Sequence, residues 1–160
     1  MTNKRYDDCG QESVREDLLL LSEMTSFEFS LGGFSGTSHF VFIDGKRNNK
    51  EIRYAKTPGG RYADLQHPNN EINLDTDIKI KEIPLTLEQW LQFVKELTAL
   101  ELQSWKDKYY DNDMYDGSQW NLKIILQGSK IISKRGNDEY PLNWDKFIVL
   151  LKKYIGKNIW

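Results

Sequence analysis

Apolar and polar side chains alternate along several short stretches of the chain, which is the pattern of strands with one buried face. In residues 26–31, for example, Phe27 and Phe29 share one side while Glu28 and Ser30 share the other. Alternation, together with the turn signal Asp44-Gly45, predicts a series of strands joined by hairpins. These strands are expected at residues 26–31, 38–43, 51–56, 77–83, 119–126 and 130–134.

A different period, with apolar residues three and four positions apart, predicts helices. The clearest begins at Thr86, because Thr86 and Gln89 have the spacing of a capping box. Its apolar stripe is Leu87, Trp90, Leu91, Val94 and Leu97, and Glu101 falls on the same stripe, which favours a frayed end there. A second helix is predicted over residues 144–155 with Gly156 as its C-terminal cap, and a third over residues 11–24.

These elements predict a single α+β domain over residues 11–160, preceded by a flexible leader of residues 1–10. We expect an antiparallel sheet of five to six strands, packed on one face by two amphipathic helices, residues 86–105 and 144–155, with the N-terminal helix at the edge. The polar segment 57–76 exceeds the usual loop length, so it is either a mobile flap or a long connection containing a short strand. The expected core comprises Trp90, Val94, Leu97, Trp120, Leu122, Ile124, Phe147 and Leu151.

The composition describes an ordinary globular chain of 160 residues, with 39% hydrophobic residues and one cysteine, Cys9, so no internal disulfide can form. No apolar run approaches the length of a membrane span, and we expect a cytoplasmic protein. The net charge of −2 divides unevenly: residues 1–117 carry −7 and residues 118–160 carry +5. The simpler interpretation is solvated charge on different elements, and the alternative is a dipolar surface that steers a partner.

Catalytic and metal-binding motifs find little support. Residues 33–36 place Gly on both sides of Ser35 without the spacing of a nucleophile elbow, because position 37 is Thr. An enzyme of unrecognised type would need a pocket around Ser35, Ser38, His39 and Glu101. His39 is expected to be a half-exposed sheet residue. Two histidines and one cysteine are too few for a zinc site, so no metal and no cofactor is predicted.

The most promising surface is the aromatic and acidic segment between the helix predicted at residues 86–105 and the strand predicted at residues 119–126. Aromatic side chains among charged residues are typical of protein-binding hot spots. The alternative is that Trp105 closes the helix core while the tyrosines cover sheet edges. The candidate partner-binding residues are Trp105, Tyr109, Tyr110, Asp111, Asp113, Tyr115 and Asp116. The acids of this set do not have the spacing of a calcium loop.

Several ordered motifs resemble a group of small, largely uncharacterised bacterial proteins. They are a Gly-rich turn at residues 32–36 after the first strand, Asp116-Gly117 three residues before Trp120, and Gly136-Asn137 before Tyr140-Pro141. The resemblance covers roughly residues 27–155. It implies an α+β protein of bacterial origin and carries no catalytic residue, because no activity is established for the group. The corner at residues 137–140 is one residue longer than the group's usual spacing.

The sequence therefore favours a non-enzymatic protein-binding module, with an immunity or inhibitor protein that neutralises a basic toxin domain as one concrete form. A nucleic-acid binder using the hairpin at residues 130–135 is a further alternative, since Lys130, Lys134 and Arg135 lie near Trp120 and Tyr140. The sequence pI of 5.7 argues against it.

Overall fold

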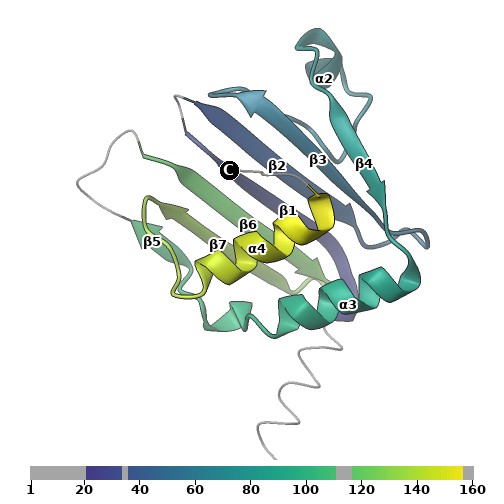
Figure 1. Ribbon diagram of the computed structural model, residues 1–160, viewed down its shortest axis with the longest axis vertical. Coiled ribbons are helices and arrows are strands. Elements are labelled where there is room, and N and C mark those ends of the chain that lie inside the picture. The colour runs from purple at the N-terminus through teal and green to yellow at the C-terminus, as the bar shows by residue number, and fades with distance from the viewer. Residues whose placement is uncertain (1–20, 34–35, 111–116, 157–160) are drawn as a thin grey trace, which may run out of the picture.

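A computed structural model describes residues 21–33, 36–110 and 117–156, and these build one seven-stranded sheet with the two longer helices on one side (Figure 1). The strand order is β4-β3-β2-β1-β6-β7-β5. Every neighbouring pair is antiparallel except β5 and β7, which run parallel. The strands are β1 (Met24–Gly32), β2 (Thr37–Asp44), β3 (Glu51–Pro58), β4 (Ile80–Pro84), β5 (Lys108–Tyr110), β6 (Gln119–Leu126) and β7 (Ile131–Asn137).

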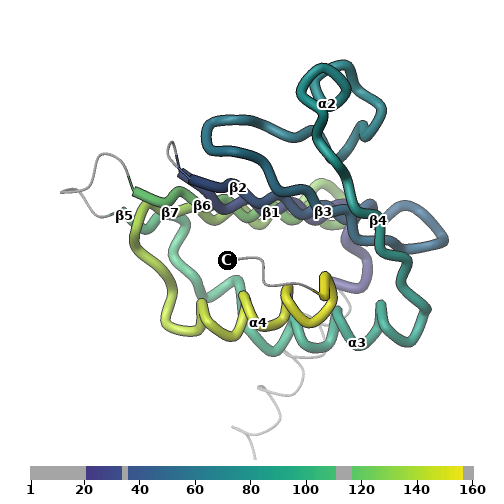
Figure 2. Tube along the Cα trace, turned by 45° about the horizontal axis from the view of Figure 1, so that its top comes forward, coloured from purple at the N-terminus to yellow at the C-terminus, as the bar shows by residue number. Residues whose placement is uncertain are grey.

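Two helices, α3 (Leu87–Thr98) and α4 (Trp144–Ile155), lie side by side across one face of the sheet, as Figure 2 shows. The short helix α2 (Glu71–Asp75) stands off the opposite face. Helix α3 begins with the predicted capping box, in which Thr86 Oγ1 accepts from Gln89 N at 3.1 Å and Gln89 Oε1 accepts from Thr86 N at 2.9 Å. Helix α4 ends at Gly156, whose φ of 78° is readily adopted only by glycine.

The core lies between the sheet and these two helices. Trp120 of β6 is fully buried and makes an edge-to-face contact with Trp105 at a centroid distance of 6.0 Å. Phe29 of β1 meets Phe147 of α4 edge-to-face at 5.0 Å. Buried aromatic pairs of this geometry add about 0.5–1.5 kcal/mol beyond the burial of their area. All eight residues expected in the core are buried.

The α+β fold and the mainly antiparallel sheet confirm the prediction, whereas several details differ. The sheet has seven strands rather than five to six, because β5 has only three residues and too little sequence to show an alternation. Helix α3 stops at Thr98 rather than continuing to Trp105, since Glu101 has a left-handed φ of 51° and a 3-10 turn (Leu102–Ser104) follows. The helix predicted over residues 11–24 falls almost wholly outside the described residues, and β1 already begins at Met24.

Candidate functional site

The sheet face opposite α3 and α4 has no helix packed on it over β1, β6 and β7 (Figure 2). Antiparallel pairing aligns its outward side chains in rows across the strands. In one row Phe40, Ser30, Asn121 and Arg135 are successive partners from β2 to β7. In the next row Phe42, Glu28, Lys123 and Ser133 take the same places. We call this surface the open face.

Residues 58–78, the wall segment, cover the β2 and β3 side of this face. Ala63 and Leu65 of the segment are buried against Phe42 and Ala55 of the sheet. Arg53 of β3 holds the wall segment on the sheet, because its guanidinium donates a hydrogen bond to the carbonyl oxygen of Leu65 at 3.0 Å. The segment contains the short helix α2 and no strand. The prediction of a long connection with a short strand inside was therefore wrong in the type of element.

Asn73, a buried residue of α2, holds the wall segment in shape. Its side-chain oxygen accepts from Asp64 N at 2.9 Å, and its amide nitrogen donates to the carbonyl oxygens of Asp64 at 2.7 Å and His67 at 3.2 Å. Buried amides satisfied in this way fix one local conformation, since the alternative is an unpaired polar group. The wall therefore has its own internal support besides its contacts with the sheet.

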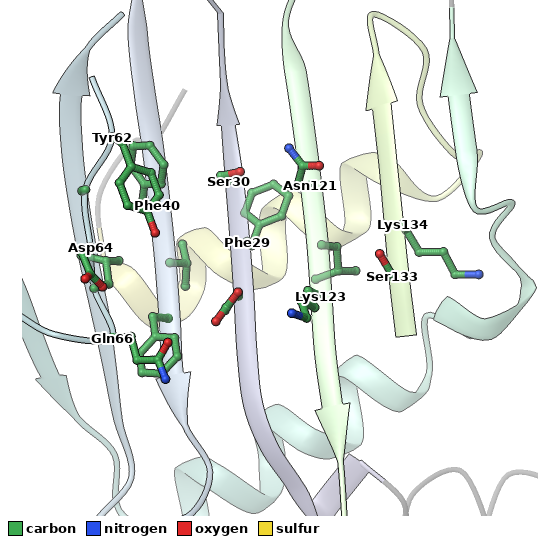
Figure 3. Close-up of a pocket in the computed structure, with 16 residues that line it drawn as sticks. Phe29, Ser30, Phe40, Tyr62, Asp64, Gln66, Asn121, Lys123, Ser133 and Lys134 are labelled. Atoms are coloured by element: carbon green, nitrogen blue, oxygen red, sulfur yellow. The ribbon is translucent and has the colours of Figure 1, made fainter. Parts of the chain in front are cut away.

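A groove of about 250 Å³ runs between the wall segment and the open face (Figure 3). Its wall side is aromatic: Tyr62, with 61% of its surface exposed, meets Phe40 edge-to-face at 5.7 Å. Its floor is polar and comes from β1, β6 and β7. The residues with polar side chains along the groove are Glu28, Ser30, Tyr62, Asp64, Gln66, Asn121, Lys123 and Ser133.

Most of the floor's polar side chains make no hydrogen bond or ion pair inside the described part of the chain. This holds for Glu28, Ser30, Asn121, Lys123 and Ser133. By contrast, Thr57 Oγ1 on β3 donates to the carbonyl oxygen of Arg61 at 2.8 Å. The groove floor thus presents donors and acceptors that a bound molecule can satisfy.

Two carboxyl groups, those of Asp64 and Glu28, lie near the Tyr62 hydroxyl on the wall side of the groove. Burial raises the pKa of the Tyr62 hydroxyl, and the carboxylates of Asp64 and Glu28 raise it further. Burial alone would raise the pKa of Asp64, but hydrogen bonds from Asn70 and His67 outweigh it and lower that pKa. Asp64 is therefore ionised at neutral pH, and the wall side of the groove favours positive charge.

The predicted partner-binding residues do not form one exposed surface among the described residues: some are buried and one is exposed. Trp105 and Tyr109 are buried, and Tyr109 packs on Trp120 at a centroid distance of 5.8 Å, which matches the alternative of core and edge packing. Tyr110, at the β5 edge, is exposed. Asp111, Asp113, Tyr115 and Asp116 lie outside the described residues.

The residues named for an enzyme pocket do not converge among the described residues. Ser38 lies on the open face, whereas the next residue, His39, points to the other side and bonds through Nδ1 to the Tyr54 hydroxyl at 2.9 Å. The expectation that His39 is half-exposed was wrong, because 5% of its surface is accessible. Glu101 follows α3, and Ser35 is not among the described residues. No group of three potential metal ligands occurs within the described ranges.

The basic hairpin at residues 130–135 is split between the two faces. Lys134 is buried on the core side, where Nζ donates to the carbonyl oxygen of Trp105 at 2.7 Å and to Asp107 at 2.8 Å. Lys130 and Arg135 are exposed. Lys134 thus supports the fold, and its charge is compensated by Asp107.

Sequence reasoning missed the groove itself. The polar positions of the alternating strands predict the side chains of its floor. Its wall depends on long-range contacts of Arg53, Asn73 and Leu65, and the wall segment has no periodic pattern that would predict them. Comparison with family models, curated proteins and solved structures gives no match for the chain. Within the described residues, no helix is long and apolar enough to cross a membrane.

Proposed function

We propose that the protein is a non-enzymatic protein-binding module whose contact surface is the groove and the open face around it. The observation that carries this proposal is the set of unpaired polar side chains on β1, β6 and β7 beside the exposed ring of Tyr62. A half-exposed aromatic next to unsatisfied donors and acceptors is the composition of a protein-binding surface.

The absence of convergence between Ser38 and His39 supports binding rather than catalysis. Nucleophilic catalysis needs a base within hydrogen-bond reach of the nucleophile, and these two side chains lie on opposite faces of β2. The acids Glu28 and Asp64 line the groove, and their proposed role is to attract a positively charged group of the partner.

An immunity or inhibitor protein is the specific form of this module that we propose, with a basic toxin domain as its partner. Support comes from Glu28 and Asp64, which give the wall side of the groove a negative potential that attracts a cationic side chain of the partner. Tyr62 and Phe40 offer aromatic rings on which such a cation stacks favourably.

The test is affinity capture from a lysate of the source organism with three baits: the wild type, Tyr62→Ala with Glu28→Gln, and the control Leu142→Ala with Lys146→Gln on the helix side. We expect one protein in stoichiometric amount with the wild type and the control, and at least a tenfold loss with the groove variant, equivalent to about 1.4 kcal/mol. Equal recovery by all three baits, or an empty eluate from the wild type, would contradict the proposal.

A nucleic-acid partner is the second candidate, because Lys108, Lys123 and Arg135 lie on the open face of neighbouring strands. Exposed cations on a sheet can track a phosphate backbone. Binding of a labelled single-stranded RNA or DNA that weakens steeply with salt and is lost in Lys123→Gln would favour this candidate. No binding at low salt would exclude it.

A further inference from the structure

The open face has a raised half and a low half. The wall segment stands above β2, β3 and β4 on the side away from α3 and α4, whereas nothing in the described residues covers β6, β7 and β5 (Figure 2). A step of this kind fits a second copy of itself when one copy is turned by half a revolution about an axis that lies parallel to the face, along the boundary between the two halves. Each raised half then lies on the low half of the other copy.

The charges follow the same division. The wall segment carries four acids, Asp64, Glu71, Asp75 and Asp77, and one basic residue, Arg61. Residues 118–137, which include β6 and β7, contain no acid; of their cations, Lys134 is already paired with Asp107. The remaining cations are Lys123, Lys130 and Arg135. A half-turn therefore sets an acidic half against a basic half at both ends of the contact.

Exposed apolar side chains occur in both halves. On the wall segment, Ile72 and Leu74 are 47% and 68% exposed. On the low half, Ile131 is 54% exposed and pairs across β6 and β7 with Ile125, which is partly buried. Burying these side chains on association is favourable in proportion to the area removed from water.

From this combination of shape, charge and exposed apolar groups, we propose that two copies of the chain associate through their open faces, wall segment on low half, as a two-fold dimer. The dimer covers the groove, so the form that binds a heterologous partner is the monomer. This regulatory part rests on the proposed function, whereas the self-association does not and is measured on the purified chain alone.

The experiment is sedimentation velocity over a wide range of protein concentration, with two charge-reversal variants. One reverses the wall, Glu71→Lys with Asp75→Lys, and the other reverses the low half, Lys123→Glu with Arg135→Glu. Lys95→Glu with Lys146→Glu, on exposed positions of α3 and α4, is the charge-matched control for the second variant. Circular dichroism melting confirms that each variant is folded.

We expect the wild type and the control to dimerise, with a dissociation constant that rises with salt. Each face variant alone should dissociate at least tenfold more readily. An equimolar mixture of the two variants should dimerise again, because both contacts in the mixed pair then join opposite charges. Dimerisation of the wild type together with this rescue is specific to the wall-on-low-half arrangement, because a wall-on-wall pair of the wild type would join like charges.

A wild type that stays monomeric at all concentrations, a dimer that neither face variant weakens, or a mixture that fails to re-form the dimer would each overturn the proposal. A monomeric wild type would leave the affinity capture unaffected, and an empty capture would leave the sedimentation result unaffected. The failures of the two proposals are therefore distinguishable.

Discussion

Glu28 of β1 faces Lys123 of β6 directly across the sheet, yet the two side chains form no ion pair within 4.0 Å. Opposite charges in this position usually contribute 0.2–1 kcal/mol as a cross-strand pair. Both side chains instead line the groove. The two charges therefore contribute no ion pair to the stability of the sheet.

This arrangement predicts that neutralising Lys123 has little effect on folding. Lys123→Gln should change the free energy of unfolding by less than about 0.5 kcal/mol, because no internal contact is lost. Lys134→Gln on the next strand should cost about 1–3 kcal/mol, since the buried carbonyl oxygen of Trp105 loses its donor. Urea denaturation measures both, and equal costs would contradict the placement of the two lysines.

The wall segment should loosen when Asn73 is removed. Asn73→Ala leaves Asp64 N without its acceptor and several carbonyl oxygens without a donor, at a cost of about 1–3 kcal/mol. Because these contacts are local, trypsin cleavage after Arg61 should accelerate at temperatures far below the main melting transition. Asn69→Ala, a neighbouring exposed asparagine, is the control; equal cleavage of the two variants would contradict the role of Asn73.

Stability should fall as the pH drops below neutrality because of His39. Burial, followed by the positive charge of Lys56, lowers the pKa of His39 from 6.5 to about 4. The unfolded chain binds a proton below pH 6.5 while the folded protein does so only near pH 4, so the stability present above pH 6.5 is lost between these values. At pH 5 the loss amounts to about 2 kcal/mol.

His39→Gln keeps a neutral hydrogen-bonding group beside Tyr54 and removes the titration. Urea denaturation at pH 7.5 and pH 5 should show a loss of about 2 kcal/mol for the wild type and a much smaller one for the variant. An equal loss in both proteins would assign the pH dependence to other groups.

Trp120 should be among the most sensitive positions of the core. It contacts Trp105, Tyr109 and Trp144, and its indole nitrogen donates to the carbonyl oxygen of Glu139 at 3.0 Å. Trp120→Ala should cost about 3–5 kcal/mol, as large aromatic truncations do. Leu142→Ala, at a fully exposed position, serves as the control, and an unchanged melting curve for Trp120→Ala would contradict the core assignment.

The sequence predicted the parts of the fold that depend on local periodicity. The capping box of Thr86 and Gln89 predicted the start of α3, and the alternation around Trp120 predicted β6. Each of these patterns is contained in a few consecutive residues. The exact end of α3 at Thr98 and the strand β5 were not predictable in this way, although the position of Glu101 on the apolar stripe had favoured a frayed helix end there. Glu101 adopts a left-handed backbone conformation although it is not a glycine, so the sequence carries no glycine that would mark the helix end. The three residues of β5 form a strand through parallel pairing with β7, which is a long-range contact.

The candidate site was harder to predict than the fold, because its side chains are placed by long-range contacts. Aromatic and acidic composition drew attention to Trp105 and Tyr109, but their burial follows from packing on Trp120, Trp144 and Phe147, which are distant in sequence. The position of Tyr62 could not be predicted for the same reason, since only the folded wall segment brings it over Phe40.

The most direct test of the central claim is photocrosslinking in cells of the source organism, with a photoreactive amino acid placed at Ser133 on the open face or at Val149 on the outer face of α4. Both positions are exposed, so substitution at either should leave the fold intact. We predict that irradiation links the Ser133 derivative, and not the Val149 derivative, to one other protein, identified by mass spectrometry. A heterologous adduct at Val149 with none at Ser133 would contradict the assignment of the open face as the contact surface.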